Sequence, residues 1–391
     1  MRTRFILAMA LGALTLTAVD ANPPVAARLQ PFIDRHQIAG AVTLIGTKNR
    51  VLSVETVGSA DLGAGRPMTP DALFWIASMS KSVTGTALMM LVDEGKVNVD
   101  DPVEKYLPEF KGQMLLAEHD QDHAVLRRPG HPLTIRTLLT HTGGLIAHTP
   151  LEQHIDRLPL RENVLIYPLI PLLFEPGARY SYSNAGINTV GRIVEVVSGL
   201  PFEEFLQQRL FTPLGMKDTT FWPDAGQLKR VAKSYGPDAR GTGLEEVRID
   251  QLSYPLSDRG RGACPAGGLF STAHDMYLLG RMIINGGSYG GRRYLSAASV
   301  AQMTSNQIGA LFPNPDYGYG FGWIVHRIDR ATDPTAPGTF GAGGAYNTQM
   351  GIDPAHNLVS VMMVQQSGFS ENDRTELRHA FTAAAENARA P

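Results

Sequence analysis

Strand-like segments gather near the two ends of this chain of 391 residues, whereas most of the middle is helical in pattern. Residues 39–65 read as two strands around a turn. Strand patterns return in residues 318–328, 344–354 and 357–368, and a helical segment closes the chain. This order predicts one antiparallel sheet built from both ends of the chain and flanked by helices, with a helical region of roughly 78–280 inserted. No repeat or linker divides residues 22–391, so we expect one α/β domain.

A second constraint is the helical segment that follows Ser78, which contains the run ALMMLV and is apolar nearly all round before Gly95. A helix without a polar face must be buried in a core. The first turn of this helix nevertheless carries three serines and one lysine. Folding of the segment therefore draws hydroxyl groups and an amine into the interior.

The lysine of this turn, Lys81, pairs with only one of the three serines. Residues three apart lie on the same face of a helix, which pairs Ser78 with Lys81, whereas Ser80 and Ser82 point elsewhere. A hydroxyl is a weak nucleophile until a neighbour takes its proton, and a lysine amine does so where burial disfavours its charge. Ser-x-x-Lys is also common as a helix cap followed by a solvated lysine, so the motif needs support from elsewhere in the chain.

That support comes from Tyr182 and Asn184, which form a Tyr-x-Asn arrangement after a Pro-Gly turn, at the start of another helical pattern. A tyrosine hydroxyl there can relay a proton to a leaving group. The asparagine amide can hydrogen-bond a substrate carbonyl or the lysine. The alternative is a helix-capping loop with a structural tyrosine.

Taken together, these motifs resemble the serine β-lactamase-like and penicillin-binding superfamily, in particular class C β-lactamases and family VIII esterases. The resemblance extends to residues 133–145, 263–287 and 340–354 and covers almost the whole mature chain. It implies the fold of that superfamily, with Ser78 as the nucleophile that is acylated and Lys81 as its base. It further implies Tyr182 as the proton relay and Asn184 as a residue that orients the substrate.

The third motif of this superfamily falls on Ala342-Gly343-Gly344, and the resemblance implies an oxyanion hole made by the backbone amides of Ser78 and Ala345. Alanine stands here where the superfamily places a cation or an aromatic residue. Ala342 cannot pair with a substrate carboxylate, and the loss of one charged hydrogen bond costs about 1.5–3 kcal/mol. Penicillins and stem peptides lose this contact, whereas neutral esters do not.

Two arginines in the glycine-rich segment SDRGRGACPAGG, Arg259 and Arg261, are possible replacements for that charge, although a solvated loop position is the simpler interpretation of both. Cys264 in the same segment is the single cysteine and has no base beside it in the sequence, so we interpret it as a buried small residue.

Other motifs are interpreted as structural. Gly286 to Gly290 match Gly-x-Ser-x-Gly, but Ser288 follows a helical pattern instead of a strand, which argues against a nucleophile elbow. His119 and His123 lie in a charged segment without a third strong metal ligand, and we expect an exposed loop. His141 is interpreted as a structural hydrogen-bonding residue.

The charge and the N-terminus bear on partners and location. A formal net charge of −2 without a Lys/Arg block excludes the basic surface that nucleic acid requires. Residues 1–21 resemble a cleaved export signal, whose apolar run is shorter than the roughly 20 residues of a membrane span. We therefore expect an exported protein, periplasmic or secreted, without a membrane span.

The sequence thus favours an exported serine hydrolase that works through an acyl-enzyme on Ser78, without a cofactor or metal, on a small ester, amide or β-lactam. An esterase or related acyl hydrolase is the preferred interpretation. The alternatives are a β-lactamase or D-alanyl-D-alanine carboxypeptidase, and a non-catalytic ligand-binding relative.

Overall fold

The computed structural model describes residues 24–149, 153–328 and 335–388. The predicted export signal, residues 1–21, lies outside this range. Within the described residues, no helix is both long and apolar enough to cross a bilayer.

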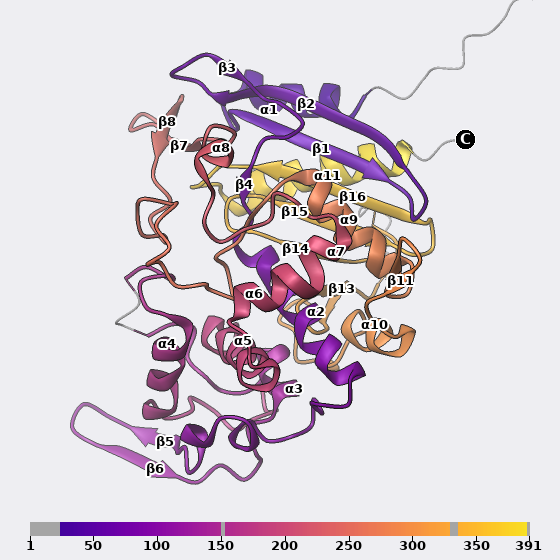
Figure 1. The fold of residues 1–391 in the computed structure, drawn as a ribbon. Helices are drawn as coiled ribbons and strands as arrows, with labels where there is room; N and C mark the ends of the chain where they lie inside the picture. Colours follow the sequence, from indigo (N-terminus) through magenta and orange to yellow (C-terminus); the bar gives the residue numbers. More distant parts are fainter. Residues whose placement is uncertain (1–23, 150–152, 329–334, 389–391) are drawn as a thin grey trace, which may run out of the picture.

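An eight-stranded antiparallel sheet joins the two ends of the chain (Figure 1). Its order is β12-β13-β14-β15-β16-β1-β2-β3, and β16 pairs with β1 in the register Ala41↔Val364. The predicted antiparallel sheet built from N- and C-terminal segments is therefore confirmed. The strands are β1 Gly40–Gly46, β2 Val51–Asp61, β3 Arg66–Pro67, β12 Tyr317–Tyr319, β13 Ile324–His326, β14 Phe340–Gly343, β15 Gln349–Asp353 and β16 Leu358–Val364.

Helices cover both faces of this sheet, which explains why every residue of the central strands β1 and β16 is buried. Ala41 and Ile45 of β1 pack in one cluster with α1 (Val25–Asp34) and α11 (Glu371–Asn387). Val42 and Leu44 belong to the main core on the other face, where α9 (Ala273–Ile284) lies. Side chains along a strand alternate between faces, so the apolar run of β1 serves two cores.

The predicted core helix is α2 (Ser80–Asp93), which the short 3₁₀ helix η1 (Ala77–Met79) precedes without a break. Every residue from Ser80 to Leu91 is buried. The helix packs against α5 (Asn184–Ser198) and α10 (Ala297–Met303). Gly85 permits part of this packing, because a Cβ at this position would clash with the carbonyl oxygen of Phe321.

The remaining helical elements of the inserted region are short. They are η2 Val103–Lys105, η3 Pro108–Phe110, α3 Ile135–Leu139, α4 Leu160–Ile166, η4 Tyr167–Leu169, α6 Phe202–Leu206, the π-helical turn η5 Gln207–Phe211, α7 Thr212–Leu214 and α8 Ala225–Leu228.

The inserted region also contains strands, which corrects the expectation that strand signals return only near the C-terminus. The hairpin of β5 (Leu115–His119) and β6 (Ala124–Arg127) projects at the foot of Figure 1. Most of its side chains are exposed, so it lacks the apolar alternation that marks a half-buried strand. A second pair inside this region is β7 Ser234–Pro237 with β8 Leu244–Val247. Two further pairs lie at or beyond its bounds: β4 Phe74–Trp75 with β9 Phe270–Ser271, and β10 Ser288–Tyr289 with β11 Arg292–Arg293.

A buried ion pair holds the glycine-rich segment that follows residue 256. Arg261 donates from Nε to Asp156 Oδ2 at 2.7 Å, and both side chains are almost fully buried. Asp156 also accepts hydrogen bonds from the backbone amides of Ser253 (2.9 Å, at Oδ1) and Gly262 (2.7 Å, at its carbonyl oxygen). One carboxylate thus joins two loops that are about a hundred residues apart in sequence.

We expect Asp156→Ala to lower the free energy of unfolding by about 3–5 kcal/mol, because it leaves the Arg261 guanidinium buried without a countercharge. Denaturant unfolding followed by circular dichroism measures this loss. Glu376→Ala is the matched control, because the pair of Glu376 with Arg35 is half exposed and contributes less than about 1 kcal/mol. Equal losses in the two variants would contradict the stabilising role of the buried pair.

Candidate active site

The structure brings Ser78 and Lys81 together at the start of the core helix. Lys81 is 2% exposed, and its Nζ lies 3.1 Å from Ser78 Oγ and 2.6 Å from the carbonyl oxygen of Ala266. The other two serines are engaged with backbone groups: Ser80 Oγ accepts from the Leu269 amide (3.3 Å), and Ser82 Oγ donates to the Met79 carbonyl (2.7 Å). Ser78 is therefore the serine whose hydroxyl meets the lysine.

The backbone just before Ser78 is strained. Ala77 has a φ of +45°, in the left-handed region that non-glycine residues rarely occupy. The flanking residue Ile76 is held on both sides, because its amide donates to the Leu269 carbonyl (2.9 Å) and its carbonyl accepts from Thr348 Oγ1 (3.3 Å). Strain of this kind costs about 1–3 kcal/mol and persists where the surrounding structure fixes it, as at functional sites.

Tyr182 completes the cluster from the loop that leads into α5. Its Oη donates to Ser78 Oγ at 2.8 Å, and Lys81 Nζ lies 4.7 Å from the centre of its ring. Ser183 is the N-cap of α5, and its Oγ accepts from the Gly186 amide at 3.0 Å, so Tyr182 directly precedes a well-defined helix start. The side chain of Tyr182 is 40% exposed, whereas Lys81 is buried, so solvent reaches the cluster from the tyrosine side.

His141 packs against this cluster from behind. Its ring centre lies 4.5 Å from that of Tyr182, and its Nε2 lies 3.0 Å from Tyr319 Oη. Its Nδ1 accepts a hydrogen bond from the Ser183 amide (3.1 Å). Burial, and then the charge of Lys81, lower the pKa of His141 from 6.5 to about 3, so the imidazole is neutral at physiological pH.

The third motif lies at the end of β14, against the segment that carries Ser78. A Cβ at Gly344 would clash with Thr348 Oγ1 and the carbonyl oxygen of Ile76, so only glycine allows this approach. Among the described residues, the backbone amides of Ser78 and Ala345 have no acceptor. Both amides are thus free to bind a ligand oxygen.

Asn184 is the first residue of α5, and its backbone amide donates to the carbonyl of Ala147 at 2.9 Å. Its Oδ1 is buried without a hydrogen-bond partner. No hydrogen bond joins Asn184 to Ser78 or Lys81 in the described part of the chain, so the possible contact with the lysine is not formed here.

Arg378 of α11 lies beside the third motif, although no motif in the sequence marks it. A Cβ at Gly343 would lie 3.5 Å from the Nη2 atom of Arg378, which places the guanidinium beside the third motif. Burial lowers the pKa of Arg378, and no hydrogen bond or ion pair neutralises it within the described residues. Arg378 lies three residues before the buried Phe381 and so on the same side of α11, but no local pattern indicates which strand this side meets.

The two arginines considered in the sequence are engaged elsewhere. Arg261 forms the buried pair with Asp156, and Arg259 stacks on Trp222 at 5.4 Å. Trp222 and Arg259 line a surface hollow of about 570 Å³ that contains none of Ser78, Lys81 and Tyr182. Arg378 is therefore a better candidate than either for a charge near the third motif.

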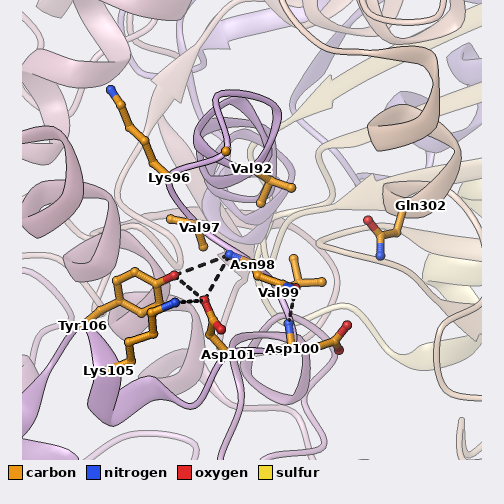
Figure 2. A pocket seen from close by; sticks show the side chains of 11 residues that line it. Val92, Lys96, Val97, Asn98, Val99, Asp100, Asp101, Lys105, Tyr106 and Gln302 are labelled. Atoms are coloured by element: carbon orange, nitrogen blue, oxygen red, sulfur yellow. Dashed lines mark hydrogen bonds and ion pairs between the residues drawn. The ribbon is translucent and has the colours of Figure 1, made fainter.

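A hollow of about 440 Å³ beside the end of α2 is shown in Figure 2. Its polar groups bind one another, since Asp101 Oδ2 accepts from Lys105 Nζ (2.7 Å) and Tyr106 Oη (2.5 Å). None of the candidate catalytic residues lines it. We interpret this hollow as structural.

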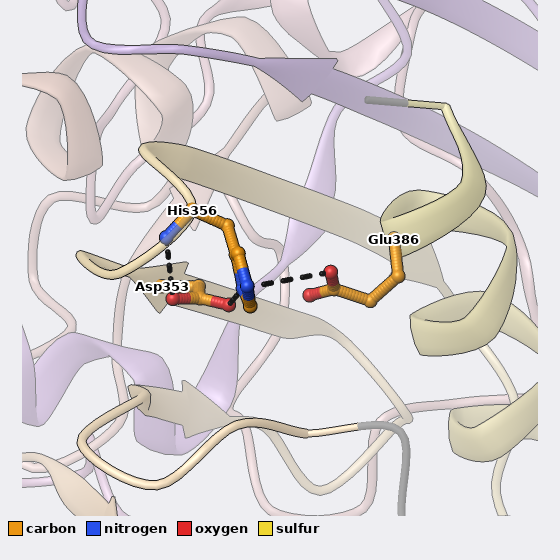
Figure 3. Close-up of side chains that lie close together, drawn as sticks. All are labelled: Asp353, His356 and Glu386. Atoms are coloured by element: carbon orange, nitrogen blue, oxygen red, sulfur yellow. Dashed lines mark hydrogen bonds and ion pairs between the residues drawn. The ribbon is translucent and has the colours of Figure 1, made fainter. Parts of the chain in front are cut away.

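Asp353, His356 and Glu386 are the one group in the described ranges whose potential metal-ligand atoms all lie within 4.8 Å of one another (Figure 3). His356 Nδ1 lies 2.6 Å from Asp353 Oδ2, a direct hydrogen-bond distance, and 3.9 Å from Glu386 Oε2. The histidine thus lies between two carboxylates and connects the β15–β16 turn to the end of α11. The hydrogen bonds of His356 to Asp353 account for the arrangement without a metal.

The residues that the sequence predicts to be structural lie away from the cluster of Ser78, Lys81 and Tyr182 or are buried. Ser288 lies in the short β10–β11 hairpin after α9, not between a strand and a helix. His119 and His123 lie in the exposed β5–β6 hairpin, where Asp120 accepts from two turn amides. Cys264 is buried.

Comparisons with known proteins agree on one family. A sequence model of the Beta-lactamase family matches residues 25–385. The chain is 30% identical to Esterase EstB of Burkholderia gladioli over 88% of this chain and 91% of that protein. It is 29% identical to Penicillin-binding protein 4 of Amycolatopsis lactamdurans, over 86% and 83% respectively. The structure of EstCE1, a hydrolase with promiscuous acyltransferase activity, is similar with a TM-score of 0.78 and 26% identity, covering 93% of this chain and 97% of that one.

The lowered pKa of His141 predicts a pH dependence of stability. Above pH 6.5 His141 is neutral in both the folded and the unfolded protein. Between pH 6.5 and about 3 His141 binds a proton in the unfolded chain but stays neutral in the folded protein. The free energy of unfolding therefore falls with decreasing pH in this window, by up to about 1.4 kcal/mol per pH unit for one proton. Denaturant titrations at pH 7, 6 and 5 should show a shallower fall in His141→Asn than in the wild type. An identical slope would contradict the burial of a neutral imidazole.

Proposed function

The chain belongs to the Beta-lactamase family, whose fold is that of serine hydrolases, and from this premise we propose that it hydrolyses small esters through an acyl-enzyme formed on Ser78. The observation that carries the proposal is the meeting of an amine and a phenol at one serine oxygen atom. Lys81 Nζ and Tyr182 Oη lie 3.1 and 2.8 Å from Ser78 Oγ. Both distances allow proton transfer to or from the serine.

Acylation begins when Lys81 Nζ takes the proton of Ser78 Oγ, which attacks the carbonyl carbon of the ester. The carbonyl oxygen becomes an oxyanion, which the amides of Ser78 and Ala345 bind. The bond to the alcohol oxygen then breaks. Tyr182 donates its proton to the departing alkoxide, and the proton held by Lys81 restores the tyrosine. Asn184 orients the substrate by contact with its acyl portion.

Deacylation needs a base for water, and no carboxylate contacts Ser78, Lys81 or Tyr182 among the described residues. Lys81 and Tyr182 therefore transfer protons in deacylation as well as in acylation. Tyr182 passes its proton to Lys81 and takes one from the water that attacks the acyl carbon. Ser78 Oγ leaves and recovers its proton through Lys81, which releases the carboxylic acid and restores the enzyme.

The preference for esters rests on Ala342, which offers no charge or hydrogen-bond donor to a substrate carboxylate. The similarity to Esterase EstB and to the hydrolase EstCE1 supports this preference. Export belongs to the same proposal, because residues 1–21 resemble a cleaved signal; N-terminal sequencing of the protein recovered outside the cytoplasm should then begin near Asn22.

A second candidate is favoured by Arg378. Its partly buried guanidinium lies beside Gly343 and, among the described residues, forms no direct ion pair, although Glu371 lies near enough to interact with its charge. Such a guanidinium suits a substrate that carries a carboxylate. A β-lactamase or D-alanyl-D-alanine carboxypeptidase has such a substrate. The similarity to Penicillin-binding protein 4 supports this candidate.

We expect Ser78→Ala to reduce the hydrolysis of p-nitrophenyl butyrate at least about a thousand-fold, because Ser78 carries the only hydroxyl among the described residues that hydrogen-bonds Lys81. Its circular dichroism spectrum and Tm should stay those of the wild type. Ser288→Ala is the matched control and should keep kcat within two-fold. Full activity in Ser78→Ala, or its loss in Ser288→Ala, would refute the assignment of the nucleophile.

Arg378→Gln distinguishes the two candidates. If Arg378 binds a substrate carboxylate, the second-order rate of acylation by benzylpenicillin falls roughly ten- to a hundred-fold, corresponding to the loss of one charged hydrogen bond. The rate with neutral p-nitrophenyl butyrate is then unchanged, as it is for both substrates in the control Arg259→Gln. Slow penicillin acylation that is equal in all three proteins would leave the esterase as the remaining candidate.

A further inference from the structure

His141 holds the chain on both sides of Tyr182. Its carbonyl oxygen accepts from the Ser181 amide at 2.8 Å, and its Nδ1 accepts from the Ser183 amide at 3.1 Å. The residue before Tyr182 and the residue after it are therefore bound to the same histidine. His141 adopts a φ of +59°, in the left-handed region. Such a conformation is unfavourable for a non-glycine residue and persists only where surrounding contacts fix it.

The imidazole also fixes the plane against which the phenol ring lies. Because Nδ1 accepts a hydrogen bond and the ring is neutral, the ring proton is on Nε2, which donates to Tyr319 Oη at 3.0 Å. The ring is thus held at both nitrogens. The ring of Tyr182 packs on it with 4.5 Å between centres, and Lys81 Nζ lies 4.7 Å from the centre of the same phenol ring.

Tyr182 needs such support because little else restrains it. Its side chain is 40% exposed and, within the described ranges, forms one hydrogen bond, to Ser78 Oγ. An exposed tyrosine on a loop has several rotamers available, whereas proton transfer requires one of them. Tyr319 is buried and supplies an anchor that forms no hydrogen bond with Ser78 or Lys81.

We infer that His141 is the positioning residue that holds Tyr182 against Ser78, and that Tyr319 fixes the orientation of its imidazole. The inference rests on the proposed role of Tyr182 in proton transfer. In this role His141 does not transfer a proton itself. His141 acts through the two backbone amides and the ring contact.

The variant His141→Asn tests this role. Asparagine tolerates a positive φ and keeps a side-chain oxygen near the Ser183 amide, but it removes the ring and the bond to Tyr319. We expect kcat for p-nitrophenyl butyrate to fall at least about ten-fold, with KM within two-fold and Tm close to that of the wild type. Tyr319→Phe keeps the aromatic packing, removes the acceptor of Nε2 and should lower kcat a few-fold.

Two controls separate positioning from general packing. Tyr180→Phe alters another ring that packs on His141, at 5.8 Å, without a hydrogen bond to it, and should leave kcat within two-fold. The double variant His141→Asn/Tyr319→Phe should be no slower than His141→Asn, because the tyrosine acts through the histidine. Additive losses would contradict this dependence.

Crystal structures of the wild type and of His141→Asn give a readout that does not depend on activity. The inference requires Tyr182 Oη within hydrogen-bond distance of Ser78 Oγ in the wild type and displaced or in several rotamers in the variant. An unmoved Tyr182 overturns the inference, whatever happens to kcat. If the wild type hydrolyses no ester but Tyr182 moves in the variant, the proposed function fails and the positioning role stands. If His141→Asn does not fold, the structure of Tyr319→Phe decides by the same criterion.

Discussion

The burial of Lys81 determines how the chain is arranged around the candidate active site. Lys81 lies in the first turn of an apolar helix, where its amine must find hydrogen-bond partners away from water. It finds Ser78 Oγ one turn earlier and the carbonyl of Ala266. The Ala266 carbonyl is itself held in place, since the Ala266 amide donates to Asn188 Oδ1 of α5 at 3.1 Å and Trp75 Nε1 donates to the Gly267 carbonyl at 2.7 Å. The polar start of α2 is thus connected, through the loop before β9, to α5 and to β4.

The proposed catalytic groups lie where the two parts of the fold meet. Ser78 comes from η1 and Lys81 from α2, Tyr182 from the loop just before α5, and Ala345 follows β14 of the sheet. The sheet is continuous only because β16 pairs with β1, so the N- and C-terminal segments together fix where the third motif faces Ser78. Neither part alone contains the whole set of residues.

Local patterns were enough to predict part of this arrangement. The apolar run of α2, the spacing of Ser78 and Lys81, and the strands at both ends of the chain are signals within short windows, and the predicted fold is confirmed. Contacts between residues that are distant in sequence leave no pattern within a short window. The pairs Asp156–Arg261 and His141–Tyr319, and the approach of Arg378 to Gly343, depend on packing between elements. The exposed β5–β6 hairpin was missed for another reason, because it lacks a buried face.

The central claim is that a substrate acyl group becomes bound to Ser78. The most direct measurement is acid-quenched intact-protein mass spectrometry of the wild type and Ser78→Ala within seconds of mixing with p-nitrophenyl butyrate, followed by peptide mapping of any adduct. The account predicts a mass increase of one butyryl group in the wild type, located on the peptide that contains Ser78, and none in Ser78→Ala. An adduct on another residue, or turnover of the ester by Ser78→Ala at the wild-type rate, would contradict it.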